Sequence, residues 1–308
     1  MIRCDRCSLP SAVHQRYSGL HLCPDHFTAD VERKVRETLR TYRLFGRGGL
    51  VAVAMSGGKD SSALLYMLKK IFSPRRDIQL VAVLVDEGID GYREQTLLSA
   101  RSLADRLKIP HRTLHFSQEF ATSTDSMAAR TRAEAPCTYC GVLRKNLLNR
   151  AAREMGATAL ATGHNLDDEA QTVLLNYLRG DVERLFRLVP RTPKEGMVPR
   201  IKPLRRVPER ELAIYAHLHG IYPQGHGSCP YVPWAMRLEI KEILNRLEAG
   251  HPGTKYALLR GFDKIQDLAG PGSFQMRQCG RCGEPTGQEV CQSCQLLERL
   301  GMGMGQRL

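Results

Sequence analysis

The segment Leu50–Ser62 joins an apolar run directly to a glycine-containing turn and then to a run with helical spacing. Residues 50–55 are rich in valine and alanine, which is typical of a buried strand. Ser56-Gly-Gly-Lys-Asp-Ser61 follows, and the apolar positions of residues 63–68 repeat with the period of a helix. In a strand–turn–helix of this kind, free backbone N–H groups and the helix dipole favour an anion at the turn. The segment therefore predicts a phosphate site, to which Lys59 adds a positive charge.

This turn differs from the Walker phosphate loop, which requires four residues between its first glycine and its Gly-Lys pair. It resembles instead the pyrophosphate loop of enzymes that cleave ATP to AMP and pyrophosphate while adenylating a carbonyl oxygen. An ordinary glycine turn is the alternative. The presence of Ser56, Lys59, Asp60 and Ser61 around the two glycines favours the nucleotide loop.

The composition of the 308-residue chain is that of an ordinary soluble globular protein, with 42% hydrophobic and 25% charged residues. Its longest apolar runs, residues 50–55 and 80–85, are too short to cross a bilayer, and the N-terminus carries no signal-peptide core. We therefore expect a cytoplasmic protein without a membrane partner. Lysine and arginine outnumber aspartate and glutamate by 45 to 32, giving a net charge of +13. This excess favours nucleic acid as a partner, and a solvated basic surface is the alternative.

Seven of the ten cysteines lie in short-spaced groups near the two ends of the chain. The N-terminal group has the patterns C-x2-C and C-x2-H, and the C-terminal group has two C-x2-C patterns. Such turns bring four ligands to a tetrahedral zinc ion, and in a cytosolic chain they indicate metal rather than disulfides. We therefore predict two zinc sites, both structural because four closed ligands leave no open position. Their ligands are Cys4, Cys7, Cys23 and His26, and Cys279, Cys282, Cys291 and Cys294.

Three cysteines remain: Cys137, Cys140 and Cys229. Three thiolates are one short of a closed zinc site, but they could hold a 4Fe-4S cluster with one iron free of protein ligands. Alternatively, Cys137 and Cys140 could form a redox or persulfide pair, with Cys229 an inert core thiol. The spacing alone favours neither interpretation.

Strand-like runs alternate with helical patterns through the middle of the chain. This alternation predicts an α/β fold, a doubly wound parallel sheet covered on both faces, flanked by the two zinc modules. The expected strands are residues 50–55, 78–85, 111–116 and 157–162, and the expected helices are residues 30–45, 92–107, 138–155, 170–178, 208–219, 234–248 and 255–268. We divide the chain into an N-terminal zinc knuckle (1–29), a central catalytic domain (30–240), a helical segment (241–270) and a C-terminal zinc ribbon (271–308).

Ligands of such sheets bind at the carboxyl ends of the strands. The residues expected to bind ATP there are Ala54, Ser56, Gly57, Gly58, Lys59, Asp60, Ser61, Asp86, Gly163 and Asp168. Of the neighbours Asp167 and Asp168, one could cap a helix and one could be a magnesium ligand or a general acid–base group. A run of basic residues indicates a polyanion-binding rim; it comprises Arg184, Arg187, Arg191, Arg200, Lys202, Arg205 and Arg206.

Five ordered motifs give the chain a close resemblance to the tRNA 2-thiouridine synthetases of archaea and the eukaryotic cytosol; they are Ser56–Ser61, Asp86–Arg93, Cys137–Val142, Gly163–Glu169 and His251–Tyr256. That family adenylates the C2 oxygen of a tRNA uridine with ATP, and sulfur then displaces AMP. The resemblance implies that Cys137, Cys140 and Cys229 hold a 4Fe-4S cluster whose open iron carries hydrosulfide. It also implies that Asp168 is the catalytic aspartate, while Lys59 and Mg²⁺ stabilise the departing pyrophosphate.

The resemblance further bears on the target base. Members that modify position 54 in the T-loop have a catalytic lysine where this chain has Arg144. Together with Asp86–Arg93, Arg144 resembles the branch that acts on the wobble uridine at position 34, and position 54 is the alternative. We expect a homodimer whose sulfur comes from the thiocarboxylate of a ubiquitin-like carrier or from inorganic sulfide.

Three other functional assignments account for fewer features of the sequence. A tRNA lysidine synthetase shares the loop but has no use for the three central cysteines. A synthetase of the amidotransferase type would act on a small molecule without needing zinc knuckles. A non-enzymatic zinc-ribbon RNA-binding protein would not need the nucleotide loop.

Overall fold

The computed structural model describes residues 2–42, 48–130, 135–181, 185, 196–221, 227–231, 236–269 and 276–302. At its centre is a five-stranded parallel sheet with the order β5-β4-β3-β6-β7. The strands are β3 (Gly49–Met55), β4 (Ile78–Asp86), β5 (His111–His115), β6 (Ala159–Ala161) and β7 (Arg200–Ile201). The chain builds outward from β3 to β5 and then returns to the other side of β3 with β6. The carboxyl ends of β3 and β6 therefore form the point where the order reverses, which is where ligands bind in sheets of this kind.

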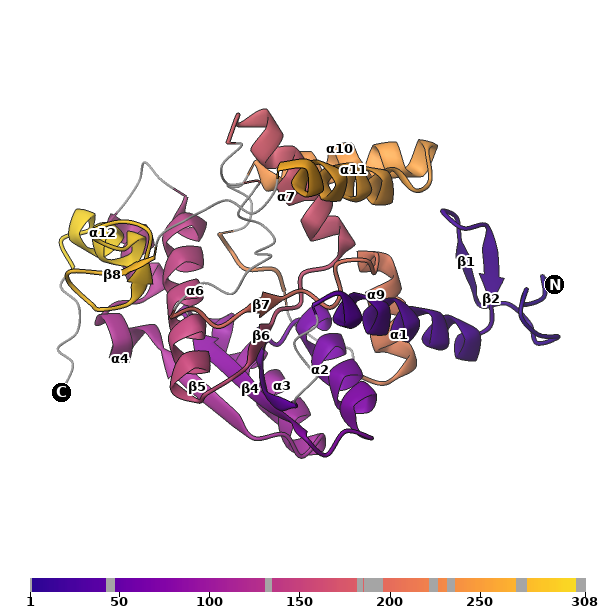
Figure 1. Cartoon of the computed structure of the whole chain (residues 1–308), viewed down its shortest axis with the longest axis horizontal. Helices are drawn as coiled ribbons and strands as arrows, with labels where there is room; N and C mark the ends of the chain where they lie inside the picture. Colours follow the sequence, from indigo (N-terminus) through magenta and orange to yellow (C-terminus); the bar gives the residue numbers. More distant parts are fainter. Residues whose placement is uncertain are drawn as a thin grey trace.

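Helices cover both faces of the sheet, so the prediction of a doubly wound α/β fold is confirmed (Figure 1). Val51 and Val53 of β3 face one core and Ala52 between them faces the other, because side chains alternate along a strand. The first core includes helices α1 (Pro24–Thr41), α2 (Lys59–Phe72), α3 (Arg93–Arg106) and α9 (Glu209–Leu218). The second includes α4 (Phe116–Phe120), α5 (Thr124–Arg130), α6 (Pro136–Glu154) and α12 (Gln292–Arg299).

Three further helices pack on one another beside the carboxyl edge of the sheet (Figure 1). They are α7 (Leu166–Leu178), α10 (Arg237–Gly250) and α11 (Thr254–Ala269). Leu166 and Val173 of α7 contact Leu259 and Phe262 of α11 in a small separate core. No helix among the described residues is long and apolar enough to cross a membrane.

Two small antiparallel hairpins lie at opposite ends of the molecule (Figure 1). The first pairs β1 (Val13–Gln15) with β2 (Leu20–Leu22), and the second pairs β8 (Arg277–Gln278) with β9 (Pro285–Thr286). Helix α1 begins at Pro24 and runs through the predicted boundary at residue 29, so the N-terminal knuckle shares a helix with the central domain.

The predicted elements agree with the structure to within a few residues, with some exceptions. Helix α7 begins at Leu166 rather than residue 170, because Asn165 caps it and forms a reciprocal capping box with Asp168. Helices α4 and α5 and the two-residue strand β7 were not predicted, since each is too short for a periodic pattern. Residues 43–45, the end of the predicted helix 30–45, lie outside the described part of the chain.

Candidate functional site

The loop between β3 and α2 is shaped by its glycines and serines. Gly57 has φ +85°, and a Cβ there would meet the backbone oxygen of Thr96 at 2.0 Å, so only glycine fits. The Ser61 hydroxyl accepts a hydrogen bond from the Ser56 backbone N–H at 3.2 Å and donates to the Gly58 carbonyl at 3.0 Å. Gly58 is the N-cap of α2 and has no side chain to bond the first helical N–H groups. The start of α2 therefore presents unpaired donors to an anion.

Strand β6 brings a third glycine, Gly163, close to this loop. A Cβ on Gly163 would lie 3.1 Å from the Ser61 backbone nitrogen, so the turn after β6 approaches the start of α2 closely. The neighbouring His164 accepts or donates a hydrogen bond with Thr162 at 2.9 Å, and burial keeps its pKa well below the ordinary value. The hydrogen bond to Thr162 braces this turn.

Lys59 and its carboxylate partners lie at the mouth of the loop. Its ammonium group lies 2.9 Å from Glu209 and 3.2 Å from Asp60, and Glu209 also pairs with Lys241 at 2.8 Å. Burial would lower the pKa of Lys59, but these two carboxylates raise it above the ordinary value. Lys59 is therefore a fixed cation at the position where the loop would receive phosphate.

Asp60 and Asp168 lie close enough to interact electrostatically at the junction of the loop and α7. The Asp60 carboxylate accepts a hydrogen bond from the Asn165 side chain at 3.3 Å, but its other oxygen is buried without a hydrogen-bond partner. Burial, together with the charge of Asp168, raises the pKa of Asp60 to about 6 against the opposing effect of Lys59. Burial also raises the pKa of Asp168, whose nearest cation is Arg237 at 3.6 Å. Two partly buried carboxylates, one of which has a buried oxygen without a hydrogen-bond partner, fit a divalent cation such as Mg²⁺.

The adjacent acid, Asp167, has a different role. It pairs with the buried Lys255 of α11 and accepts a hydrogen bond from the Glu209 backbone N–H at 2.8 Å. Its carboxylate therefore ties α11 and α9 to α7 and is not available to a ligand. Asp86, the last residue of β4, bonds the Gly88 N–H at 2.9 Å and His115 at 3.1 Å, which holds it at the carboxyl edge.

The central cysteines meet beside helix α6. Cys137 and Cys140 lie in its first turns, and the Cys137 thiol lies 3.5 Å from the backbone oxygen of Tyr231, two residues after Cys229. Burial, followed by the charge of Cys229, raises the pKa of Cys137. Burial likewise raises the pKa of Cys140 to about 11, against the neighbouring Arg144. A metal centre would have to displace these protons.

The spacing of these three thiols differs from that of a mononuclear site. Within the described ranges, the groups whose ligand atoms lie within 4.8 Å of one another are the two terminal ones, and Cys137, Cys140 and Cys229 are not among them. A single ion requires closely spaced sulfurs, whereas a cubane cluster spans a larger gap. Their spacing is therefore not that of a closed single-ion site, and the cluster stays a prediction.

Glu87 connects the cysteines to the nucleotide loop. This buried carboxylate lies 3.1 Å from Arg144 and, through its other oxygen, 2.6 Å from Arg93. Arg93 also donates hydrogen bonds to the backbone oxygens of Ser56 at 2.6 Å and Val85 at 2.9 Å. Burial lowers the pKa of Arg144, but the charge of Glu87 outweighs this effect and keeps that pKa above its ordinary value. Half of the Arg144 side chain remains exposed, so its guanidinium can still reach a substrate.

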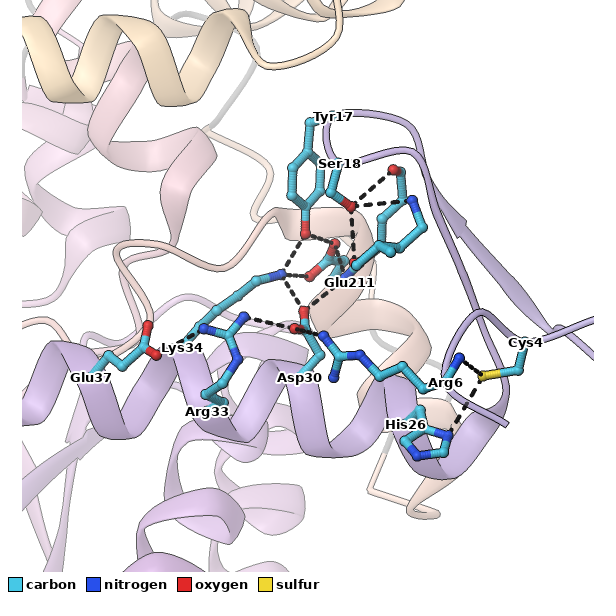
Figure 2. A network of polar contacts seen from close by, with 12 residues as sticks. Cys4, Arg6, Tyr17, Ser18, His26, Asp30, Arg33, Lys34, Glu37 and Glu211 are labelled. Atoms are coloured by element: carbon cyan, nitrogen blue, oxygen red, sulfur yellow. Dashed lines mark hydrogen bonds and ion pairs between the residues drawn. The ribbon is translucent and has the colours of Figure 1, made fainter. Parts of the chain in front are cut away.

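The two terminal groups have the geometry expected for structural metal sites. In the N-terminal group, Cys7 and Cys23 have sulfurs 3.7 Å apart, and His26 Nδ1 lies 3.3 Å from the Cys23 sulfur. The same nitrogen lies 3.5 Å from the Cys4 sulfur (Figure 2). These separations are close to the edge of a tetrahedron with zinc–sulfur bonds of about 2.3 Å. The predicted ligand His26 therefore lies where the fourth ligand is needed.

The C-terminal group is built in the same way. Its sulfurs are paired at 3.8 Å between Cys279 and Cys294 and at 3.6 Å between Cys282 and Cys291. Burial would raise the pKa of Cys279, but hydrogen bonds from backbone N–H groups lower it to about 6. All four of these thiols are buried, whereas Cys7 and His26 of the N-terminal group are partly buried. Each group offers four ligands, so both could hold a metal ion without an open position for chemistry.

The predicted basic rim is wrong for part of its length. Lys202 lies 2.6 Å from Glu169, and the buried Arg205 lies 2.7 Å from Asp263, so both cations neutralise internal acids. Arg206 is exposed, whereas Arg200 is partly buried and this burial lowers its pKa. The remaining members, Arg184, Arg187 and Arg191, lie outside the described residues.

Several site residues were not identified from the sequence. Glu87, Arg93 and Lys255 act through contacts between distant segments, although each lies inside a motif that was recognised, Asp86–Arg93 or His251–Tyr256. Glu209 and Arg237 belong to no recognised motif. Glu87, Arg93 and Lys255 are charged residues within recognised motifs to which no role was assigned. That charge was the signal in the sequence that could have identified them.

Comparison with known proteins agrees with this geometry. Residues 27–222 match the family described as a PP-loop domain, and residues 3–28 match the N-terminal LIM domain of the 2-thiouridine synthetase TtuA. The chain is 38% identical to the tRNA 2-thiolation protein NcsA of Haloferax volcanii, covering 97% of this chain and 99% of that protein. It is 36% identical to cytoplasmic tRNA 2-thiolation protein 1 of Caenorhabditis elegans, over 96% of this chain and 80% of that protein.

A solved structure is also similar over the full length. The U34-tRNA thiolase NcsA from Methanococcus maripaludis, determined with its 4Fe-4S cluster, superposes with a TM-score of 0.87 at 34% identity, covering 100% of this chain and 99% of that chain. The nucleotide loop, the three central cysteines and both terminal metal groups thus occur together in a fold shared from end to end. The chain therefore belongs to the PP-loop family and, within it, to the tRNA 2-thiolation proteins.

Proposed function

We propose that this protein is an ATP-dependent tRNA-uridine 2-sulfurtransferase that adenylates the C2 oxygen of a uridine and then replaces that oxygen with sulfur. The observation that carries the proposal is the buried Glu87, which links the nucleotide loop through Arg93 to the cysteine site through Arg144. Both halves of such a reaction must act on one base, so the two sites must lie within reach of each other.

The first half-reaction uses the residues around the loop. The unpaired N–H groups at the start of α2 and the ammonium of Lys59 would bind the ATP phosphates and stabilise the departing pyrophosphate. Asp60 and Asp168 fit Mg²⁺, which when bound would neutralise charge on the phosphate oxygens. Attack of the uridine C2 oxygen on the α-phosphate then gives the adenylated base and pyrophosphate. Adenylation is needed because oxide is a poor leaving group from a carbonyl carbon.

The second half-reaction uses the cysteine site. Cys137, Cys140 and Cys229 would hold a 4Fe-4S cluster, which supplies an iron without a protein ligand where sulfur is presented to the base. Sulfur attacks C2, and AMP leaves with the former C2 oxygen. The Arg144 guanidinium, half-exposed beside two of these cysteines, would stabilise the negative charge on the departing phosphate.

We further propose the wobble uridine, position 34, as the target, since the similar structure of Methanococcus maripaludis is described as a U34-tRNA thiolase. We infer zinc at both terminal groups from their ligand sets and spacing. A cytoplasmic location follows the name of the Caenorhabditis elegans relative. A homodimer, and sulfide or a thiocarboxylate as the sulfur source, remain proposals.

The test is thiolation in vitro under anaerobic conditions. Protein reconstituted with iron and sulfide is incubated with ATP, sulfide and unmodified tRNA, and the nucleosides are analysed by mass spectrometry. Isolated anticodon stem-loops and T-arms are compared with whole tRNA. We expect 2-thiouridine at position 34 and release of AMP. Sulfur at position 54 alone would overturn the assigned target, and AMP release without any thiouridine would overturn the sulfur-transfer function.

A further inference from the structure

A cavity of about 910 Å³ lies apart from both halves of the site, between the β1–β2 hairpin, helix α1 and the turn joining α10 to α11. Its lining includes Tyr17, Lys34, Arg206, Tyr256 and Arg260 but no residue of the nucleotide loop and none of the central cysteines. We infer that this cavity binds a part of the tRNA that is distant from the reacting uridine, an inference that rests on the proposed function. It would hold backbone phosphate and one unstacked base.

The charge of the cavity fits phosphate. Arg206 and Arg260 are exposed, and in the described part of the chain neither guanidinium has an ion-pair partner. Glu37 is the acidic lining residue, and it is neutralised by Arg33 at 2.8 Å. Unpaired arginines bind phosphate through planar, bidentate hydrogen bonds, so these two side chains are free to contact an RNA backbone.

Two tyrosines give the cavity a surface for a base. The rings of Tyr17 and Tyr256 have centroids 4.8 Å apart and are tilted by 47°. The Tyr256 hydroxyl donates a hydrogen bond to the backbone oxygen of Arg206 at 2.8 Å, which fixes its ring beside one of the arginines. Aromatic faces next to cations are the usual platform on which single-stranded bases stack. The cavity volume is within the range that accommodates a nucleotide.

The wall formed by the N-terminal module is rigid. Tyr17 donates a 2.6 Å hydrogen bond to the buried Glu211 of α9, which also accepts from Lys34 at 2.8 Å and from Gln15 at 3.0 Å (Figure 2). Lys34 is further bound to Asp30 at 2.9 Å. These buried contacts fix the hairpin against the central domain, so the cavity is preformed and binding need not order it.

The opposite wall is connected to the active site. It is formed by the motif His251–Tyr256, whose turn is fixed by Glu248 through the backbone N–H groups of Gly253 at 2.7 Å and Lys255 at 2.9 Å. Lys255 contacts Asp167, which precedes the catalytic candidate Asp168, whereas the next residue, Tyr256, lines the cavity. The same turn therefore borders both places, which suits one RNA that contacts the cavity while its uridine reaches the active site.

The experiment measures tRNA affinity of the full-length, metal-loaded protein as a function of salt, using Arg206→Ala, Arg260→Ala and the double variant. Each lost phosphate contact lowers the magnitude of the slope of log affinity against log salt by about 0.7–0.9. The slope of the double variant should therefore be smaller in magnitude by roughly 1.5 than that of the wild type. The double variant should also bind tRNA at least tenfold more weakly at low salt. Tyr256→Ala should weaken binding. Tyr256→Phe should weaken it less, because the ring is kept and only its hydrogen bond to the Arg206 backbone is lost. Arg76→Ala, an exposed arginine in the turn between α2 and β4, is the matched control and should leave affinity and slope unchanged.

Two outcomes separate this inference from the proposed function. Wild-type tRNA affinity and slope in the double variant, with thiolation intact, would overturn the cavity as an RNA site and leave the proposed function standing. Failure of the wild-type protein to thiolate tRNA would instead remove the function on which the inference rests. If the double variant loses ATP binding but retains tRNA binding, the cavity is a nucleotide site and the inference is wrong. Thermal unfolding of every variant checks that the fold is retained.

Discussion

The carboxylate of Glu87 lies 3.1 Å from the guanidinium of Arg144 with one oxygen and 2.6 Å from that of Arg93 with the other. Arg93 reaches on to the backbone oxygen of Ser56, the first residue of the nucleotide loop. One buried acid thus joins the helix that carries two of the central cysteines to the loop that binds ATP. In the proposed reaction, this contact would hold the cysteine helix in place relative to the nucleotide loop.

The first prediction concerns Glu87→Gln. The neutral amide leaves two arginines facing each other without their shared carboxylate, and removing one partner from a buried ion pair costs about 3 kcal/mol of folding stability. We expect a lower melting temperature, retained ATP binding and a thiolation rate reduced by at least tenfold, because Arg144 loses its anchor. Glu94→Gln, an exposed acid on α3, is the control and should behave as wild type. Equal losses of ATP binding and thiolation would show that Glu87 supports the loop alone.

The second prediction concerns the partly buried carboxylate of Asp60, whose pKa is raised to about 6 from an ordinary 3.8. A raised carboxyl pKa means that the folded state holds the proton more tightly than the unfolded state. Through this group the protein therefore loses stability as the pH rises from about 4 to about 6, and the loss persists above that range. Two pKa units correspond to about 3 kcal/mol.

Asp60→Asn should therefore raise the melting temperature of the nucleotide-free protein in a chelator at pH 7.5 and have little effect at pH 4.5, while abolishing AMP formation. Asp77→Asn is a suitable contrast, since Arg75 lowers the pKa of that exposed carboxylate and its removal should bring no gain in stability. A lower melting temperature for Asp60→Asn at pH 7.5 would contradict the desolvation argument.

The third prediction concerns the central cysteines. Protein prepared without oxygen should be brown and contain about four iron atoms per chain, as expected for a cubane held by three thiolates. Replacement of Cys137, Cys140 or Cys229 by alanine should each remove the visible absorbance and sulfur transfer, while ATP binding at the loop persists. Colourless protein with full thiolation activity would favour the persulfide route through the same cysteines.

The sequence predicts local elements well and long-range contacts poorly. The strand–turn–helix at Leu50–Ser62 was recognisable because its apolar period, glycines and charge all lie within thirteen consecutive positions. Strand β7 was not recognisable in the sequence, because two residues are too few to show an alternating pattern. Its place in the sheet depends on pairing with β6. The capping role of Asn165 was also missed, since the acids that follow it are equally good candidates for a helix cap.

The same distinction holds for the site. Ligands of the terminal metal groups could be chosen from spacing, because the geometry of a knuckle is local. Spacing could not predict which acids pair with Lys202 and Arg205. Their partners, Glu169 and Asp263, lie more than thirty positions away in the sequence. Charge clustering in the sequence therefore overestimated the exposed basic surface, because a cation's partner is visible only in the folded chain.

The last prediction concerns the terminal metal groups. After iron is removed with a chelator, two zinc ions per chain should remain, because four closed ligands hold each ion. Cys282→Ala should reduce the count to one and also destabilise the central domain, since Leu296 and Leu297 of α12 pack into the core on one face of the sheet. The ion pair between Glu284 and Arg153 at 2.7 Å would be lost with the module.

His26→Ala should likewise leave one zinc ion, but with a different structural consequence. The N-terminal hairpin is held to α9 by Glu211 independently of the metal, so its backbone should resist proteolysis better than the C-terminal module does in Cys282→Ala. Cys137→Ala, which removes a cluster ligand, is the control and should retain both zinc ions. Elemental analysis and limited proteolysis measure these outcomes. A single zinc ion in the wild-type protein, with no change on replacing His26, would show that the N-terminal group is not a zinc site.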